Sequence, residues 1–143
     1  MMVRLLYASR ADDSVNEPTL HAILKQSRAH NPEVGITGVL CFCLNVRTFM
    51  QVLEGGRGQV SRLYNRIAQD RRHRDVELLC YEDIDERRFA SWSMGQVNMN
   101  RINPALLLRY SETARLDPYG VSGQASMRLF DELVATASIV GQG

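Results

Sequence analysis

The stretch "FMQVLEGG", residues 49–56, predicts a β-strand that ends in a Gly-Gly turn. Side chains alternate along a strand, so Phe49, Gln51 and Leu53 share one face, and the glutamine occupies a position suited to a core residue. A buried amide without partners costs roughly 1–3 kcal/mol. We therefore expect Gln51 either to have partners within the protein or to hold a polar ligand.

The segments around this strand predict a repeated order of strand and helix. Residues 3–9, "VRLLYAS", form an apolar strand, and Asn16 can cap a helix that presents Leu20, Ile23 and Leu24 on one side. "GITG" (35–38) leads into "VLCFCL" (39–44), which forms a hairpin with residues 48–54. A helix over residues 58–70 and a strand over 76–84 complete a βαββαβ order. This order predicts an α+β fold of the ferredoxin-like type.

The remaining residues predict a short fifth strand at 94–99 and two helices. Asn103 and Pro104 provide a helix start before "ALLLRY", and Ser122 caps an amphipathic second helix. The apolar side of that helix comprises Met127, Phe130, Leu133, Val134 and Ala137. We expect both helices to pack on the sheet face opposite the first two helices, and we divide the chain into residues 1–100 and 101–143.

Composition narrows the classes of function. The 143 residues are 45% hydrophobic and contain 17 basic and 16 acidic side chains, so they suit one globular domain without the basic field that nucleic acid requires. No apolar run approaches the ~20 residues that cross a membrane. Three cysteines and no signal-peptide pattern predict a cytoplasmic protein with reduced thiols.

Several polar side chains are expected to meet between the two helices. In this fold we expect the first and third strands to lie side by side and parallel, with both helices on one face. Tyr7 and Gln51 would then be neighbours on the helix side. Pairs four residues apart share a helix face, and two such pairs stand near the helix ends: Ser27 with Asn31, and Arg66 with Asp70.

Such a cleft would suit a planar ligand with a polar rim. A purely structural interpretation is also open. Arg66 and Asp70 could form only a surface ion pair, and the Tyr7 hydroxyl could bond to the backbone.

Five segments in this order and spacing resemble the BLUF domain, a flavin-binding blue-light sensor. They are "LLYAS", "HNPEVGITGVLCF", "FMQVLEG", "NRIAQDRRH" and "WSM", and the resemblance covers residues 3 to about 99. The remaining residues resemble the tail of short, stand-alone BLUF proteins. The resemblance implies a photoreceptor without a catalytic domain, whose tail signals through a homo-oligomer or an unidentified effector protein.

The resemblance also implies roles for individual residues. The isoalloxazine of FAD would lie between the two helices, and FMN or riboflavin could replace it. Tyr7 matches the photoactive tyrosine of the family and Gln51 its switching glutamine, while Trp92 and Met94 match a mobile segment beside them. The implied cofactor-binding residues are Ser27, His30, Asn31, Phe49, Gln51, Arg66, Ile67, Asp70 and His73.

Two other functions remain open from the residues alone. A ferredoxin-like domain can be a flavin-free protein-interaction module, or a small acylphosphatase-like hydrolase. The sequence shows neither a nucleophile paired with a base nor a phosphate-binding loop, which disfavours the hydrolase. A yellow colour of the purified protein separates the sensor from both alternatives.

Overall fold

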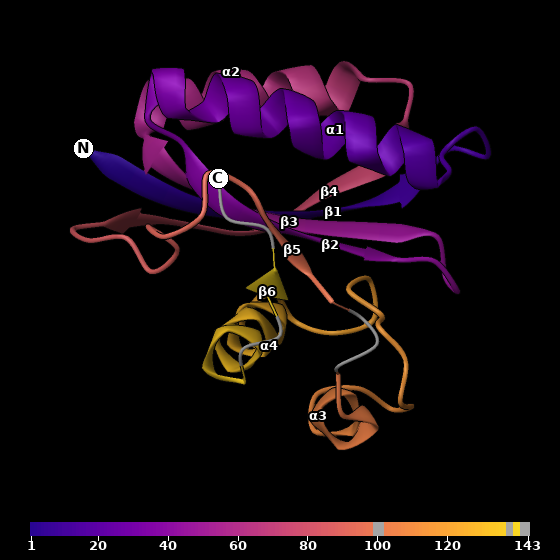
Figure 1. The fold of residues 1–143 in the computed structure, drawn as a ribbon. Coiled ribbons are helices and arrows are strands. Elements are labelled where there is room, and N and C mark those ends of the chain that lie inside the picture. Colours follow the sequence, from indigo (N-terminus) through magenta and orange to yellow (C-terminus); the bar gives the residue numbers. More distant parts are fainter. Residues whose placement is uncertain (99–101, 137–138, 141–143) are drawn as a thin grey trace.

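A computed structural model describes residues 1–98, 102–136 and 139–140, and its elements form one sheet between two layers of helices (Figure 1). Helices α1 and α2 cover one face of the sheet, and α3 and α4 lie on the other. The elements are β1 (Met2–Ala11), α1 (Glu17–His30), the 3-10 helix η1 (Asn31–Val34), β2 (Thr37–Cys43), β3 (Thr48–Gly56), α2 (Arg57–Gln69), β4 (His73–Ile84), β5 (Gly95–Val97), α3 (Pro104–Leu108), α4 (Gly123–Ala135) and β6 (Ile139–Val140).

Three helix starts are capped as the sequence predicts. The side chains of Asn16, Asn103 and Ser122 each accept a hydrogen bond from a backbone amide in the first turn of α1, α3 and α4, respectively. The predicted βαββαβ order is confirmed. The structure adds three features that the pattern did not predict: η1, the two-residue strand β6, and an earlier start of β4 at His73.

The strands are ordered β4-β1-β3-β2-β5-β6 across the sheet. The expected parallel arrangement of the first and third strands is wrong, because β1 pairs with β3 antiparallel. The β2–β3 hairpin reverses the chain, so β3 must run against β1 when it lies between β1 and β2. Tyr7 and Gln51 are nevertheless neighbours, as predicted, since they are direct cross-strand partners.

Successive side chains of β1 and β3 point to opposite faces of the sheet and pack into two separate cores. On the side of α1 and α2, Leu5 and Leu53 pack with Leu20 and Leu24. The core on the other side contains Leu6, Ala8, Val39, Met50, Val52, Phe89, Leu106, Leu107, Met127, Phe130 and Leu133. The prediction that the C-terminal helices cover this second face is therefore confirmed.

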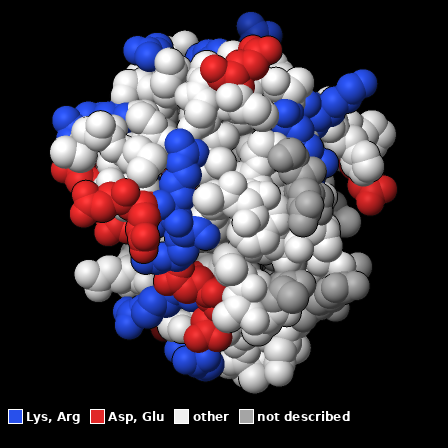
Figure 2. Space-filling model, turned by 60° about the vertical axis from the view of Figure 1, so that its left-hand side comes forward, with Lys and Arg blue, Asp and Glu red and all other residues white. Residues whose placement is uncertain are grey.

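Some sequence predictions fall on residues outside the described part of the chain. These are the boundary between residues 100 and 101, the end of the predicted fifth strand at Met99, and Ala137 on the last helix. Among the described residues, no helix has the length and apolar character required to span a bilayer. On the face in Figure 2, acidic and basic side chains are interleaved and form no extended patch of one sign.

Candidate functional site

A cavity of about 500 Å³ lies between α1 and α2, and residues of β1, β2 and β3 form its floor. This volume is typical of small-molecule sites. Apolar side chains of Ile23, Leu40 and Leu63 contribute to its walls. The predicted site residues that line it are Tyr7, Ser27, His30, Asn31, Gln51, Arg66, Ile67, Asp70 and His73.

The floor of the cavity carries a chain of hydrogen bonds through Gln51. The Tyr7 hydroxyl donates to Gln51 Oε1 over 2.6 Å, and Gln51 Nε2 donates to Met94 Sδ over 3.1 Å. All three side chains are buried, so water does not compete for these bonds. Gln51 therefore has partners within the protein at both ends of its amide, and it also faces the cavity. The bond to Gln51 replaces the backbone bond considered for Tyr7.

Tyr7 is held as a neutral hydrogen-bond donor. Burial raises the pKa of its hydroxyl far above the ordinary value, with a smaller contribution from Tyr64. Its ring lies 5.8 Å from the ring of Tyr64 and 6.2 Å, edge-on, from that of His73. The phenol is thus fixed by packing on two sides and bonded to one acceptor.

The end of α1 places an amide at the cavity and fastens the segment before β5. Asn31 is almost fully buried and its Nδ2 donates to the carbonyl of Ser93 over 3.1 Å. Its backbone amide donates to the Ser27 carbonyl, so the predicted spacing of four residues holds here. Arg28 on the same helix donates from Nε to the carbonyl of Met94 over 3.0 Å.

The end of α2 differs from the arrangement that spacing predicts. Asp70 follows the last residue of α2 in an extended conformation, so it does not continue the helix face that carries Arg66. Its carboxylate accepts hydrogen bonds from the backbone and guanidinium of Arg72, which lower the pKa of Asp70. The described contacts include no ion pair between Arg66 and Asp70, and Arg66 Nη2 instead contacts His30 Nε2 at 3.5 Å. Both residues of the predicted pair still line the cavity.

His73 lies at the start of β4 and is only 9% exposed. Its Nδ1 is hydrogen-bonded to Ser9 Oγ at 2.7 Å, and burial lowers the pKa of the imidazole to about 4. Phe49 does not line the cavity, since its ring packs behind it against Phe42 at 4.6 Å and His73 at 4.8 Å. The arginine-rich run at 71–74 thus contributes a buried residue, His73, to the wall of the cavity.

Met94 and Trp92 belong to opposite sides of the sheet. Met94 is fully buried in the core beneath α1 and α2, whereas Trp92 is partly buried against the core beneath α3 and α4. Of these two residues, Met94 accepts a hydrogen bond from Gln51, and the described contacts include none between Trp92 and Gln51. Trp92 is therefore placed away from the cavity in this structure.

Sequence reasoning missed several wall residues. The cavity is also lined by Gln26, Ala29, Glu33 and Arg72, none of which is among the predicted site residues. Residues 26, 29, 30 and 33 follow the helical spacing of three and four, so the periodicity of α1 contained the signal. The assembled cavity can hold a flat ligand between apolar side chains and present amide, guanidinium and carboxylate groups to its edge.

Comparisons with known proteins agree with this geometry. A family model described as "Sensors of blue-light using FAD" matches residues 2–95. A 90-residue region is 37% identical to the photoactivated adenylate cyclase subunit alpha of Euglena gracilis and covers 63% of this chain but 9% of that protein. Residues of this chain are 35% identical over 95 positions to the blue light- and temperature-regulated antirepressor BluF of Escherichia coli K12, covering 66% of this chain and 23% of the antirepressor. The chain thus spans less than a quarter of these curated relatives, so their whole activities do not transfer to it.

Two solved structures match along almost their entire length. The photo-activated state of BlsA is 34% identical with a TM-score of 0.82, covering 100% of this chain and 99% of that one. The dark state of the BLUF protein BlrB is 28% identical with a TM-score of 0.75, covering 95% and 96%. Together with the family match over residues 2–95, these similarities favour the flavin sensor over the hydrolase and the flavin-free interaction module. The chain belongs to the BLUF family of blue-light sensors that use FAD.

Proposed function

We propose that Tyr7, Gln51 and Met94 are the light-responsive residues of this sensor and that the cavity between α1 and α2 holds the isoalloxazine of FAD. The observation that carries the proposal is the buried chain of hydrogen bonds from Tyr7 through Gln51 to Met94, of which Tyr7 and Gln51 line the cavity. Asn31, Arg66 and Asp70 supply donors and acceptors for a polar ring edge. Ser27, His30, Ile67 and His73 complete the walls, and Phe49 supports them from behind.

The flavin, when bound, supplies absorption of blue light and a strong oxidant in its excited state. Tyr7 would act as the donor of an electron together with its hydroxyl proton, because the phenol is neutral and already bonded to Gln51. Gln51 carries an acceptor and a donor on one group, so a turn or tautomer change of its amide exchanges the two without moving the backbone. Met94 Sδ is a weak acceptor, so the bond from Gln51 Nε2 to Met94 is the easier one to give up.

Chromophore release and difference spectroscopy test this proposal. The chromophore released by heat is expected to have the mass of FAD, and blue light should shift its protein-bound absorption to the red. A colourless protein that cannot be reconstituted with FAD contradicts flavin binding.

Tyr7→Phe should retain the flavin and lose the red shift, because only the hydroxyl donor is removed. Gln51→Leu should behave in the same way. Tyr64→Phe is the matched control, since Tyr64 packs against the Tyr7 ring without bonding to Gln51, and it should keep the shift. A normal red shift in Tyr7→Phe refutes the proposed donor.

We also propose that α3 and α4 pass the signal to a second copy of this chain or to an effector protein in the cytoplasm. These helices contact the face of the sheet that backs onto Gln51, and Leu108 on α3 is 54% exposed. Light scattering in darkness and under blue light should show a change in mass, and Leu108→Lys should weaken the assembly. A chain that is monomeric in both conditions, with no light-sensitive partner in its own cell extract, reduces the tail to a structural cap.

A further inference from the structure

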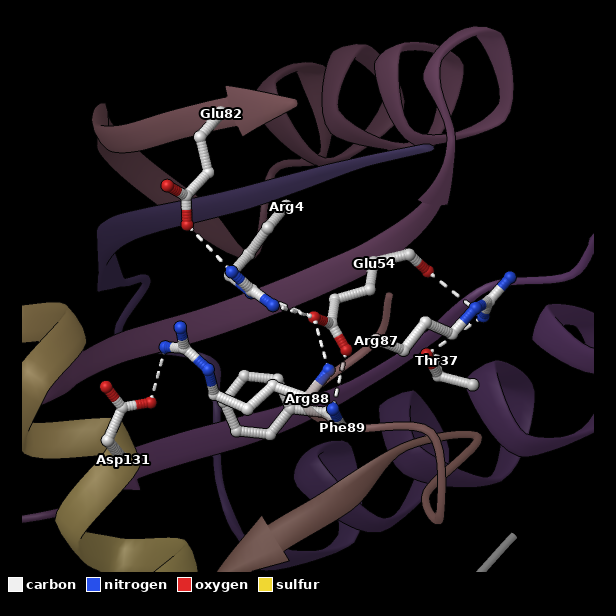
Figure 3. Close-up of polar contacts among 8 residues, drawn as sticks. All are labelled: Arg4, Thr37, Glu54, Glu82, Arg87, Arg88, Phe89 and Asp131. Carbon is white, nitrogen blue, oxygen red and sulfur yellow. Dashed lines mark hydrogen bonds and ion pairs between the residues drawn. The ribbon is translucent and has the colours of Figure 1, made fainter. Parts of the chain in front are cut away.

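Glu54 is a fully buried carboxylate that does not line the cavity of the light-sensing site. It lies near the end of β3 on the same face as Met50 and Val52, and its side chain is completely buried. Three neighbours donate hydrogen bonds to it: Arg4 Nε over 2.8 Å, the Arg88 amide over 2.9 Å and the Phe89 amide over 2.6 Å (Figure 3). Glu54 thus ties β1, β3 and the loop after β4 to one point.

The same two loop residues reach α4 with their side chains. Arg88 forms an ion pair with Asp131 at 2.6 Å, and the Phe89 ring packs edge-on against Phe130 at 6.5 Å (Figure 3 shows the ion pair). Phe89 is fully buried, so its ring position depends on where its backbone is held. Glu54 therefore fixes the backbone of Arg88 and Phe89, and the side chains of these two residues contact Asp131 and Phe130 of α4.

The loop continues directly into the light-sensing site. After Phe89 the chain turns, and the carbonyls of Ser93 and Met94 accept hydrogen bonds from Asn31 and Arg28. Met94 Sδ accepts the bond from Gln51 Nε2. Only residues 90–93 separate Phe89 from Met94, and this stretch is held at Trp92, whose amide donates to the Phe89 carbonyl and whose carbonyl accepts from the Gly38 amide.

We infer that Glu54 is a positioning residue that transmits a change at Gln51 and Met94 to α4, by holding the backbone of Arg88 and Phe89 against the sheet. The inference rests on the proposed light-responsive role of Gln51 and Met94, and it adds the route from that site to the tail. A carboxylate suits this task because its two oxygens accept from two successive amides and a guanidinium at once. Spatial continuity alone does not establish coupling, so the test must measure a response at α4.

The test uses the full flavin-loaded protein and compares Glu54→Gln with Glu82→Gln. Glu82 is the matched control, because it also pairs with Arg4, at 2.7 Å, but makes no described hydrogen bond to Arg88 or Phe89. Hydrogen exchange of residues 123–135 is measured in darkness and under blue light, together with the red shift of the flavin. In the parent protein, coupling of ordinary strength changes the exchange of α4 amides by about fivefold or more on illumination.

Glu54→Gln should keep the red shift and lose the light-dependent change at α4, while Glu82→Gln should keep both. A purely structural role of Glu54 would lower the melting temperature without removing the response. The inference is overturned if folded Glu54→Gln responds at α4 like the parent, or if the parent shifts its absorption with no change at α4. A parent protein without a red shift would instead contradict the proposed function.

Phe89→Leu provides a second test if Glu54→Gln does not fold. It keeps the Phe89 amide on Glu54 but removes the ring contact with Phe130. The expected result is a normal red shift with a reduced response at α4. An unchanged response at α4 overturns the inference.

Discussion

His73 makes the stability of this protein depend on pH in a narrow, testable range. The imidazole is buried beside Tyr7 and Phe49, and burial lowers its pKa from the usual 6.5 to about 4, against an opposing effect of Asp70. The unfolded chain therefore binds a proton at a higher pH than the folded protein does. Stability is fully present above pH 6.5 and is lost as the pH falls towards 4.

The size of the effect follows from these two values. Between pH 7 and pH 5, His73 becomes almost fully protonated in the unfolded state but stays largely neutral in the folded state, which corresponds to a loss of about 2 kcal/mol in the free energy of unfolding. Asp12 and Asp70 also have lowered pKa values. They add to the loss of stability only as the pH approaches 3.8, the ordinary pKa of an aspartate. The interval from pH 7 to pH 5 therefore isolates the histidine.

Urea denaturation at pH 7 and pH 5 measures this loss. The midpoint of the parent protein should fall by about 1 M, given slopes typical of small domains. His73→Gln should remove most of the difference between the two pH values, whatever its effect on stability at pH 7. His21→Gln, at an exposed position of α1, is the matched control and should keep the difference.

Two results would refute this reasoning. The parent protein could lose no stability between pH 7 and pH 5, or His73→Gln could lose as much as the parent. Flavin in the cavity would cover His73 further, so the loaded protein should show at least the same pH dependence.

Two further variants test the cavity rim and the tail. Asn31→Ala should weaken flavin retention by roughly 1–3 kcal/mol, about 5- to 150-fold in the dissociation constant, because a buried amide partner is lost; Asn65→Ala, exposed on α2, should bind like the parent in a flavin titration. Gly123→Ala should lower the free energy of unfolding by about 1–3 kcal/mol in urea denaturation, because the new methyl group would overlap the Leu79 carbonyl oxygen. Gly56→Ala is its control, since the space beside that glycine is open, and equal losses in the two glycine variants would contradict the steric argument.

Local patterns predicted most of the elements, though not η1 or β6, and the two cores of the fold. Caps at Asn16, Asn103 and Ser122 and the alternation of Leu5 with Leu6 depend only on neighbouring residues, and the structure confirms both. The relative direction of β1 and β3 was predicted wrongly, because a hairpin fixes direction through the whole connection and not through either strand. The position of β3 was correct, so Tyr7 and Gln51 still met.

On the helix side of the cavity, the contacts of the site residues could be predicted only where the helices continue regularly. Asn31 keeps the helical spacing from Ser27, whereas Asp70 leaves the helix and pairs with Arg72, which no spacing rule anticipates. The orientation of Met94 could not be read from alternation, because β5 begins only at Gly95. Sequence reasoning did not identify Glu54, because it lies at a strand end. It nevertheless alternates with Met50 and Val52, which places it on the buried face of β3.

The antiparallel strands β1 and β3 contribute side chains to both cores, so the two helical layers should unfold together. Removing either helical layer would leave one side of the same strands in water, so neither layer can be lost while the other remains intact. Calorimetry of the chain should accordingly give one transition whose van't Hoff and calorimetric enthalpies agree. Heating should release the flavin and unfold α4 at the same temperature, so the loss of colour should coincide with the loss of the proposed signalling helix.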